Sequence, residues 1–153
     1  MVGGPNQTHI PQRNIWTAAR THDDPGLFPN IRLGVEGQEA HGKIDCGAEA
    51  NLIDEDFVRR HGIQHLLKDE PYEIITINNQ RKNRKVTRET VPLEVMVYGK
   101  TMTVVFDIIP LVRDVILGEP WLEEHNPIIN WRERTLEWHG LDWDELTEYP
   151  QGD

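Results

Sequence analysis

The chain has 153 residues, of which 37% are hydrophobic, and 26 acidic and 16 basic residues give it a formal net charge of −10. That length suits a single domain with a core of moderate size. The negative charge argues against broad binding to nucleic acids or to anionic membranes. Cys46 is the single cysteine, so no intrachain disulfide can form and we expect a reducing compartment. We also expect no membrane span and no signal peptide, and therefore a cytoplasmic chain that is a piece of a longer polypeptide.

The first part of the chain leads into a hairpin. Residues 1–28 show little pattern and begin with a stretch rich in Gly, Pro, Asn and Gln, which is typical of a flexible flank. Apolar and polar residues then alternate over residues 31–36, and after a turn at Gly37 a returning strand is predicted over residues 39–45. This hairpin delivers Asp45 at its end.

A short helix is predicted soon after the hairpin. Asp54 has the character of an N-cap, acidic residues follow it, and Gly62 is a stop signal. Further along, residues 73–77 favour a strand. Residues 86–98 and 101–109 predict a second, longer hairpin.

The last part of the chain contains a strand, a helix and a final hairpin. Residues 114–117 predict a short strand that ends at Gly118, and Pro120 suits the first turn of a helix. Residues 128–138 predict the hairpin, and the acidic residues 141–153 indicate a linker or tail. Many short strands, two short helices and glycine turns together predict a mostly β domain of the small, closed barrel type.

Asp45 is the main candidate for chemistry. A bare Asp-x-Gly more often marks an acid that caps a turn, but here a strand delivers Asp45, Gly47 permits close backbone approach, and a second strand ends at Gly118. Two carboxylates about 3 Å apart can share one proton, because such close like charges cannot both ionise. The chain has no second Asp-x-Gly turn, so the second carboxylate would come from another copy in a C2 homodimer.

Two motifs carry a resemblance to a known family. Ile44-Asp45-Cys46-Gly47-Ala48 and the following residues 51–58 resemble the Asp-Ser/Thr-Gly-Ala loop and next helix of retropepsin-like aspartic proteases. Residues 114–122, with His125-Asn126-Pro127 and Ile129-Asn130-Trp131 behind them, are similar to the second signature of the protease domain in gypsy-type LTR retrotransposon polyproteins.

The resemblance covers residues 29–140 and implies a fold and an activity. The family's domain is a small closed β-barrel that forms a homodimer, each copy giving one catalytic Asp. Its activity is hydrolysis of peptide bonds, chiefly in its own Gag-Pol polyprotein, which places it with virus-like particles inside the cell. The resemblance implies a polypeptide substrate, no cofactor, no metal and no membrane or nucleic-acid partner.

The resemblance also implies roles for particular residues. Asp45 matches the catalytic Asp, and the active-site loop continues through Cys46, Gly47, Ala48 and Glu49. The apolar-apolar-Gly strand that packs behind this loop corresponds to Ile116, Leu117 and Gly118. The substrate pocket and the flap that closes over substrate correspond to Lys43, Ile77, Asn78, Asn79 and Gln80.

Four features depart from the family pattern. Cys46 stands where Ser or Thr usually braces the dimer, and cysteine is a weaker hydrogen-bond donor. Glu49 stands where Thr or Asp is common, either to bind substrate backbone or as a solvated turn acid. Lys43 replaces an apolar residue, which would tune the charge around Asp45, shift specificity or mark a decayed site. The flap stretch 78–85 has no glycine. An alternative is therefore a catalytically inactive or domesticated module for dimerisation or peptide binding.

Other residue groups are interpreted as structural. Five basic residues cluster over residues 81–88, and we interpret them as a solvated hairpin tip rather than a nucleic-acid contact. His61 and His65 have the spacing of metal ligands, but no third ligand joins them in sequence, so no metal is assigned. We predict that three tryptophans anchor the core: Trp121, Trp131 and Trp138.

Overall fold

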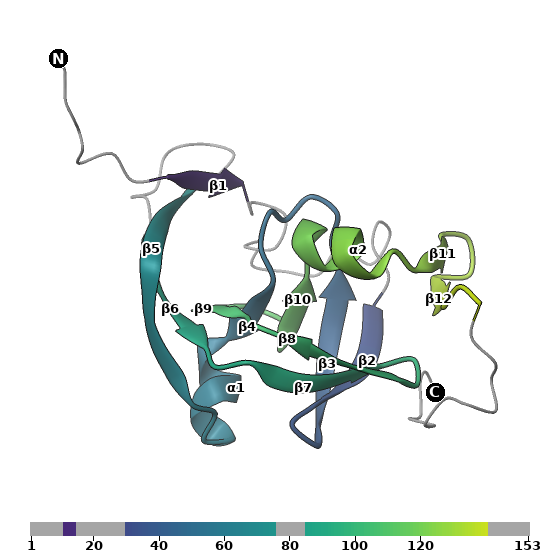
Figure 1. Cartoon of the computed structure of the whole chain (residues 1–153), viewed down its shortest axis with the longest axis horizontal. Coiled ribbons are helices and arrows are strands. Elements are labelled where there is room, and N and C mark those ends of the chain that lie inside the picture. Colours follow the sequence, from purple (N-terminus) through teal and green to yellow (C-terminus); the bar gives the residue numbers. More distant parts are fainter. Residues whose placement is uncertain (1–10, 15–29, 76–84, 141–153) are drawn as a thin grey trace, which may run out of the picture.

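The computed structural model describes residues 11–14, 30–75 and 85–140. Within them the chain forms mainly strands, together with two short helices, neither long and apolar enough to cross a membrane (Figure 1). The elements are β1 Gln12–Asn14, β2 Asn30–Val35, β3 Gln38–Ile44, β4 Leu52–Asp54, α1 Glu55–Arg60, β5 His65–Ile75, β6 Lys85–Thr90, β7 Leu93–Val97, β8 Lys100–Val104, β9 Asp107–Ile109, β10 Val115–Leu117, α2 Glu119–His125, β11 Ile128–Asn130 and β12 Thr135–Glu137. The prediction of a mostly β domain with two short helices is confirmed.

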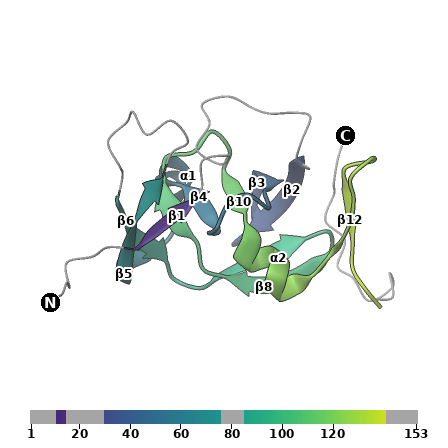
Figure 2. The same cartoon turned by 90° about the horizontal axis from the view of Figure 1, so that it is seen from above.

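Ten of the strands belong to one curved sheet. Its order is β1-β5-β6-β9-β4-β10-β3-β2-β7-β8, and β11 and β12 form a separate two-stranded sheet. Figures 1 and 2 both place β5 and the β11–β12 pair at opposite ends of the domain. The turn that carries Asp45 follows β3, which lies between β10 and β2 in this order.

The first hairpin forms where the sequence predicts it. β2 and β3 pair antiparallel around a turn at Gly37, whose φ of +79° suits glycine. Leu33, Ala40 and Ile44 are fully buried, as expected for one face of an alternating hairpin. Burial of this face fixes the register and so determines where the strand ends, at Ile44.

The larger core lies beneath this hairpin and the β7–β8 pair. Trp121 packs edge-on against Trp138 with ring centroids 5.8 Å apart, and its indole N–H donates to the Met102 sulfur at 3.1 Å. The Trp138 N–H donates to the Val97 carbonyl at 3.1 Å. Trp121 and Trp138 are core anchors as predicted, but the prediction for Trp131 is wrong, because its side chain is 47% exposed.

The second hairpin differs from its predicted form. The stretch 86–98 is two strands, β6 and β7, separated by Val91 and Pro92. Proline has no N–H for the ladder and fixes φ, so the strand is interrupted there. β6 then pairs with β5 and β9, whereas β7 pairs with β2 and β8. The stretch 101–109 is also divided into two strands, β8 and β9, which are separated by Val105 and Phe106.

One strand is longer than the sequence predicts, and two strands are additional. β5 begins at His65 rather than residue 73, through a polar stretch that pairs with β6 across an irregularity in register. β4 and β1 are also additional, and β1 lies within the part of the chain predicted as a flank. These segments lack an apolar alternation of their own, so their pairing depends on partners distant in sequence.

The helix boundaries follow local signals, with one change in role. α1 starts after Asp54 and ends before Gly62, which has a φ of +62°. The Asp54 side chain does not cap α1; its Oδ1 accepts the Leu111 N–H at 2.8 Å instead. α2 has Pro120 in its first turn and ends at Asn126 in the left-handed conformation.

Replacing Trp121 with alanine should lower the free energy of unfolding by about 3–5 kcal/mol, because it removes the largest buried side chain and leaves a cavity. Chemical denaturation followed by far-UV circular dichroism measures this. Trp131→Ala is the matched control and should change stability by less than about 0.5 kcal/mol, since the residue is exposed. Equal effects of the two substitutions would contradict the assigned core.

Candidate active site

Asp45 occupies a buried turn at the end of β3. Its exposed fraction is 0%, and its backbone N–H donates to the Leu117 carbonyl at 2.9 Å. The Gly47 N–H donates to Oδ1 of the carboxyl group at 2.8 Å, and the Ala48 N–H donates to the Asp45 carbonyl at 3.1 Å. One carboxyl oxygen is thus held by the turn. The other, Oδ2, is buried without a hydrogen-bond partner among the residues that the structure describes.

β10 supports this turn from behind. It pairs parallel to β3, with Leu117 opposite Ile44, and antiparallel to β4, with Ile116 opposite Leu52. β10 is therefore inserted between the strand that leads into the Asp45 turn and the strand that leaves it. This insertion fixes both ends of the loop, because each end shares a ladder with the same strand.

Gly118 lies where β10 meets the loop, and the contact leaves no room for a side chain. A Cβ atom at this position would lie 2.2 Å from the Ala50 carbonyl oxygen and 2.6 Å from that of Ala48. The backbone of Gly118 is extended, so space rather than φ requires glycine. Its N–H donates to Asn51 Oδ1 at 3.0 Å, and the next N–H, of Glu119, donates to the Ala48 carbonyl at 2.7 Å.

The other loop residues divide into buried and exposed positions. Ala48 is fully buried and Gly47 partly so, whereas Cys46 and Glu49 are exposed. The loop thus faces the interior through its alanine and the surface through the two residues that depart from the family pattern. The Cys46 thiol is therefore open to solvent beside a buried carboxyl group.

Lys43 lies on the same side of the strand as Asp45. Side chains alternate along extended backbone, so residues 43 and 45 share a face opposite to Ile44. Lys43 is only 5% exposed and is paired in register with Ile116. Ile116 belongs to a second, smaller apolar cluster: Ala48, Ala50, Leu52, Tyr72, Ile74, Val86, Ile109 and Ile116. Lys43 and Asp45 therefore face the part of the domain beneath β5 and β6.

Four predicted site residues, Ile77, Asn78, Asn79 and Gln80, lie outside the described residues. The strands on either side of them are described. β5 and β6 pair antiparallel up to Glu73 opposite Lys85. The two strands thus bring Glu73 and Lys85 side by side, and the predicted flap residues lie beyond this pairing, outside the described part of the chain.

A buried polar network on β5, β6 and β9 was not predicted from the sequence. The Tyr72 hydroxyl donates to Asp107 Oδ2 at 2.5 Å, and Lys68 Nζ donates to Asp107 Oδ1 at 2.9 Å and to Glu89 Oε1 at 3.1 Å. The residues are separated by up to 39 positions in the chain, so no local pattern brings them together. A tyrosine and a lysine four residues apart in a β-prone, polar stretch were the only signal.

This network changes the ionisation of two of its members. Burial raises the pKa of Tyr72, and the charge and hydrogen bond of Asp107 raise it further, against an opposing effect of Arg13. Burial lowers the pKa of Lys68, but the hydrogen bonds and charges of Asp107 and Glu89 outweigh burial and leave the pKa above its ordinary value. Both groups therefore hold their protons more firmly in the folded chain.

Asn51 connects the network to the Asp45 loop. The Asp107 N–H donates to the Asn51 carbonyl at 2.9 Å, and the Asn51 side chain accepts the Gly118 N–H. A continuous path of hydrogen bonds thus runs from Tyr72 on β5 through Asp107 and Asn51 to the strand behind Asp45. The Asp45 loop and the β5–β6 pair are thus connected through hydrogen bonds.

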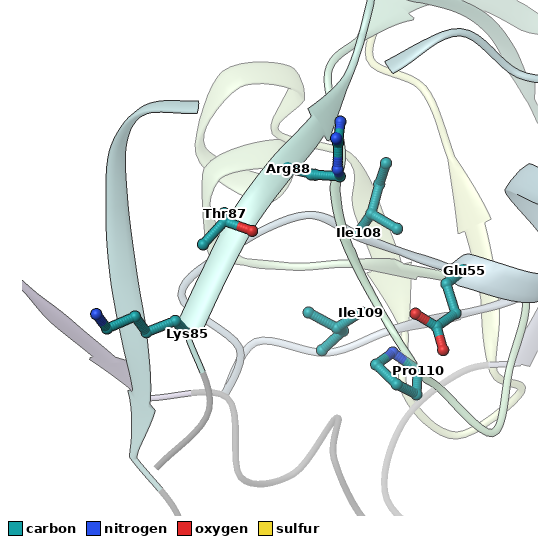
Figure 3. A pocket seen from close by; sticks show the side chains of 7 residues that line it. All are labelled: Glu55, Lys85, Thr87, Arg88, Ile108, Ile109 and Pro110. Atoms are coloured by element: carbon teal, nitrogen blue, oxygen red, sulfur yellow. The ribbon is translucent and has the colours of Figure 1, made fainter. Parts of the chain in front are cut away.

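A separate hollow of about 310 Å³ lies on the β6–β9 side of the domain (Figure 3). Its lining combines apolar residues with charged ones: Glu55, Lys85, Thr87, Arg88, Ile108, Ile109 and Pro110. Lys85 and Arg88 belong to the basic cluster of the sequence. Asp45 does not line this hollow, so it is not the place where that carboxyl group would meet a ligand.

Comparisons with known proteins agree with this geometry. Residues 43–144 match the family described as the PEG10/RTL1 protease domain, and the chain therefore belongs to that family of retropepsin-like protease domains. A crystal structure of the retroviral protease-like domain of Ddi1 from Leishmania major is similar to this one, with a TM-score of 0.55 and 16% sequence identity. The similarity covers 78% of this chain and 97% of that chain, and it shows a shared retroviral protease-like fold.

Replacing Gly118 with alanine should lower the free energy of unfolding by about 1–3 kcal/mol, because the new methyl group overlaps two carbonyl oxygens and must push β10 away from the loop. The midpoint of denaturation in urea measures the change. Thr103→Ala on the exposed side of β8 is the control and should have little effect. A Gly118→Ala chain as stable as the parent would contradict the contact.

Stability should fall as the pH rises above about 10, where unfolded tyrosine and lysine lose protons that folded Tyr72 and Lys68 retain. Tyr72→Phe should cost about 1–3 kcal/mol at neutral pH, because Asp107 loses a buried partner. The variant should also show a shallower loss of stability above pH 10. Urea denaturation at a series of pH values measures both effects, and a slope equal to that of the parent would argue against the network.

Proposed function

We propose that this domain is an aspartic endopeptidase that acts as a homodimer, with Asp45 of each chain forming the catalytic pair. The observation that carries the proposal is the Asp45 carboxyl group, which is fully buried with Oδ1 held by Gly47 and Oδ2 unpartnered among the described residues. A buried polar atom without a partner is costly in a folded protein, and such atoms concentrate at functional sites. A second carboxyl group from a partner chain would supply what Oδ2 lacks.

The chemistry follows from the sharing of one proton by the pair. The ionised carboxylate takes a proton from a water molecule between the two groups, and that water attacks the carbonyl carbon of the peptide bond to form a tetrahedral intermediate. The protonated carboxyl group donates a hydrogen bond to the carbonyl oxygen as negative charge develops there. When this intermediate collapses, the C–N bond breaks, the amine nitrogen receives a proton from one carboxyl group, and the pair is again singly protonated. The rate should have a bell-shaped dependence on pH, since only the singly protonated pair is active.

The proposed substrate is an extended polypeptide segment, in the first instance a Gag-Pol-type polyprotein that contains this domain. The base of the flap, β5 and β6, lies over the apolar cluster that Lys43 and Asp45 face. An extended segment between the flap and the Asp45 loop would pair with backbone groups as an added strand. In this proposal the sheet closes into a barrel in each chain, and the protein works in the cytoplasm in association with virus-like particles.

One observation favours a second candidate function. Lys43 is buried on the face of the strand that carries Asp45, at a position where the family resemblance leads us to expect an apolar residue. The second candidate is a domesticated module that binds polypeptide and dimerises without cleaving it. The two candidates predict the same binding and differ in hydrolysis.

Asp45→Asn should reduce peptide cleavage by at least about a thousandfold while the fold is retained, because the amide keeps an oxygen for the Gly47 N–H but cannot act as a base. Incubation with a peptide library and with a Gag-type polyprotein, followed by mass spectrometry, measures cleavage. Asp69→Asn on the exposed part of β5 is the matched control and should cleave as the parent does. Undiminished cleavage by Asp45→Asn would refute the assignment, and binding without cleavage by the parent would favour the second candidate.

A further inference from the structure

The edge of β5 that does not pair with β6 is covered by residues 11–14 of the same chain. β1 pairs parallel to β5, with Gln12 opposite Glu73 and Arg13 opposite Ile74, and the Glu73 N–H donates to the Pro11 carbonyl at 2.8 Å. β5 uses its other edge for β6. The pairing lies immediately before residues 76–84, so a segment from the start of the chain runs along the base of the predicted flap.

The side chain of Arg13 joins this strand to the Asp45 loop. Its Nη1 donates to the Glu49 carbonyl at 3.2 Å, and its guanidinium group lies over the Tyr72 ring, 4.5 Å from the centroid. In Figure 1, β1 runs from the upper end of β5 toward the loop between β3 and β4, and Figure 2 also places it beside β5. The segment thus contacts the flap strand through its backbone and the loop through its arginine.

Tyr72 and the Glu49 carbonyl suit a guanidinium group better than other side chains. Tyr72 is 1% exposed and its hydroxyl group donates to the buried Asp107, so the ring is held in one place. A planar guanidinium group can stack on this fixed face and at the same time donate in its own plane to a carbonyl oxygen. A neutral side chain would lose both interactions, and a lysine would keep the charge but not the planar stacking.

We propose that Tyr72 and the Glu49 carbonyl form a subsite for an arginine of a polypeptide strand added to β5, and that residues 11–14 occupy this site within the same chain. The inference rests on the proposed function in that a substrate would lie along the same strand. β1 is then an internal competitor: a separate polypeptide must displace it before it can pair with β5. A strand of three residues is short enough to exchange, and its tether keeps its local concentration high.

The test uses the full chain with Asp45→Asn, so that binding is measured without cleavage. The probe is a fluorescein-labelled peptide of the chain's own residues 10–15, and fluorescence anisotropy gives its affinity. Adding Arg13→Ala to the chain should tighten binding of this peptide about tenfold, because the vacated subsite accepts the arginine of the probe. Gln12→Ala is the matched control on the same strand and should leave the affinity unchanged.

Two further measurements decide the role of the arginine. A second probe, in which the arginine of the peptide is replaced by alanine, should bind the Arg13→Ala chain no more tightly than it binds the parent. The affinity of the Arg13→Lys chain for the original probe should lie between those of the parent and of Arg13→Ala. In the parent, the Nε–H resonance of Arg13 should be shifted by the Tyr72 ring and should move to its free position when the probe is added. The proposal would be overturned if the original probe bound the parent and the Arg13→Ala chain equally tightly, or if the two probes bound the Arg13→Ala chain equally tightly. Because no cleavage is measured, the result is independent of whether the unmodified chain is a protease.

Discussion

The close contact between Gly118 and the loop that carries Asp45 is the constraint on which this structure depends. The contact is possible only because residue 118 has no side chain to meet the carbonyl oxygens of Ala48 and Ala50. It lets β10 lie between β3 and β4 and lets the Leu117 carbonyl receive the Asp45 N–H. The buried carboxyl group is therefore positioned by backbone packing.

A hydrogen-bonded network around Asp107 links this loop to β5. Asp107 is bound by Tyr72 and Lys68 from β5 and, through its N–H, by the Asn51 carbonyl at the end of the loop. Buried polar groups of this kind are stabilising only when every member has partners. The network therefore joins the Asp45 loop to β5 and β9 through side chains and backbone groups of three separate parts of the chain.

Two features of the described residues support the functional proposals, an unpartnered carboxyl oxygen at Asp45 and a paired strand edge at β5. Asp45 Oδ2 is unpartnered among the described residues, which is the reason to expect a second carboxyl group from another copy. The edge of β5, in contrast, is already paired with β1, and Arg13 joins that strand to the loop. In the two proposals, the first feature calls for a partner chain, and the second calls for displacement of β1 by a bound polypeptide.

Much of the site could be predicted from the sequence because its parts are local. The β2–β3 hairpin, the Asp45 turn, both short helices and the strand ending at Gly118 each have their own signal in alternation, capping or glycine placement. β1 and the first half of β5 have no such signal, because β propensity is weak in polar stretches and depends on the strands that pair with them. β4 is mostly apolar but only three residues long, too short to show an alternation. The break at Pro92 does have a local signal, the proline itself, but the apolar alternation on either side of it favoured a single strand.

The sequence by itself determined that a carboxyl group would stand at a glycine turn at the end of a strand, since alternation and turn chemistry act over a few residues. Only the tertiary structure decided what surrounds it. The contacts of Asp107 with Tyr72 and Lys68, and those of Arg13 with Tyr72 and Glu49, join residues 35 to 59 positions apart. The burial of Lys43 likewise depends on strands that are distant in sequence, since β3 pairs there with β10. Such contacts depend on the order of strands in the sheet, which no short stretch of sequence encodes.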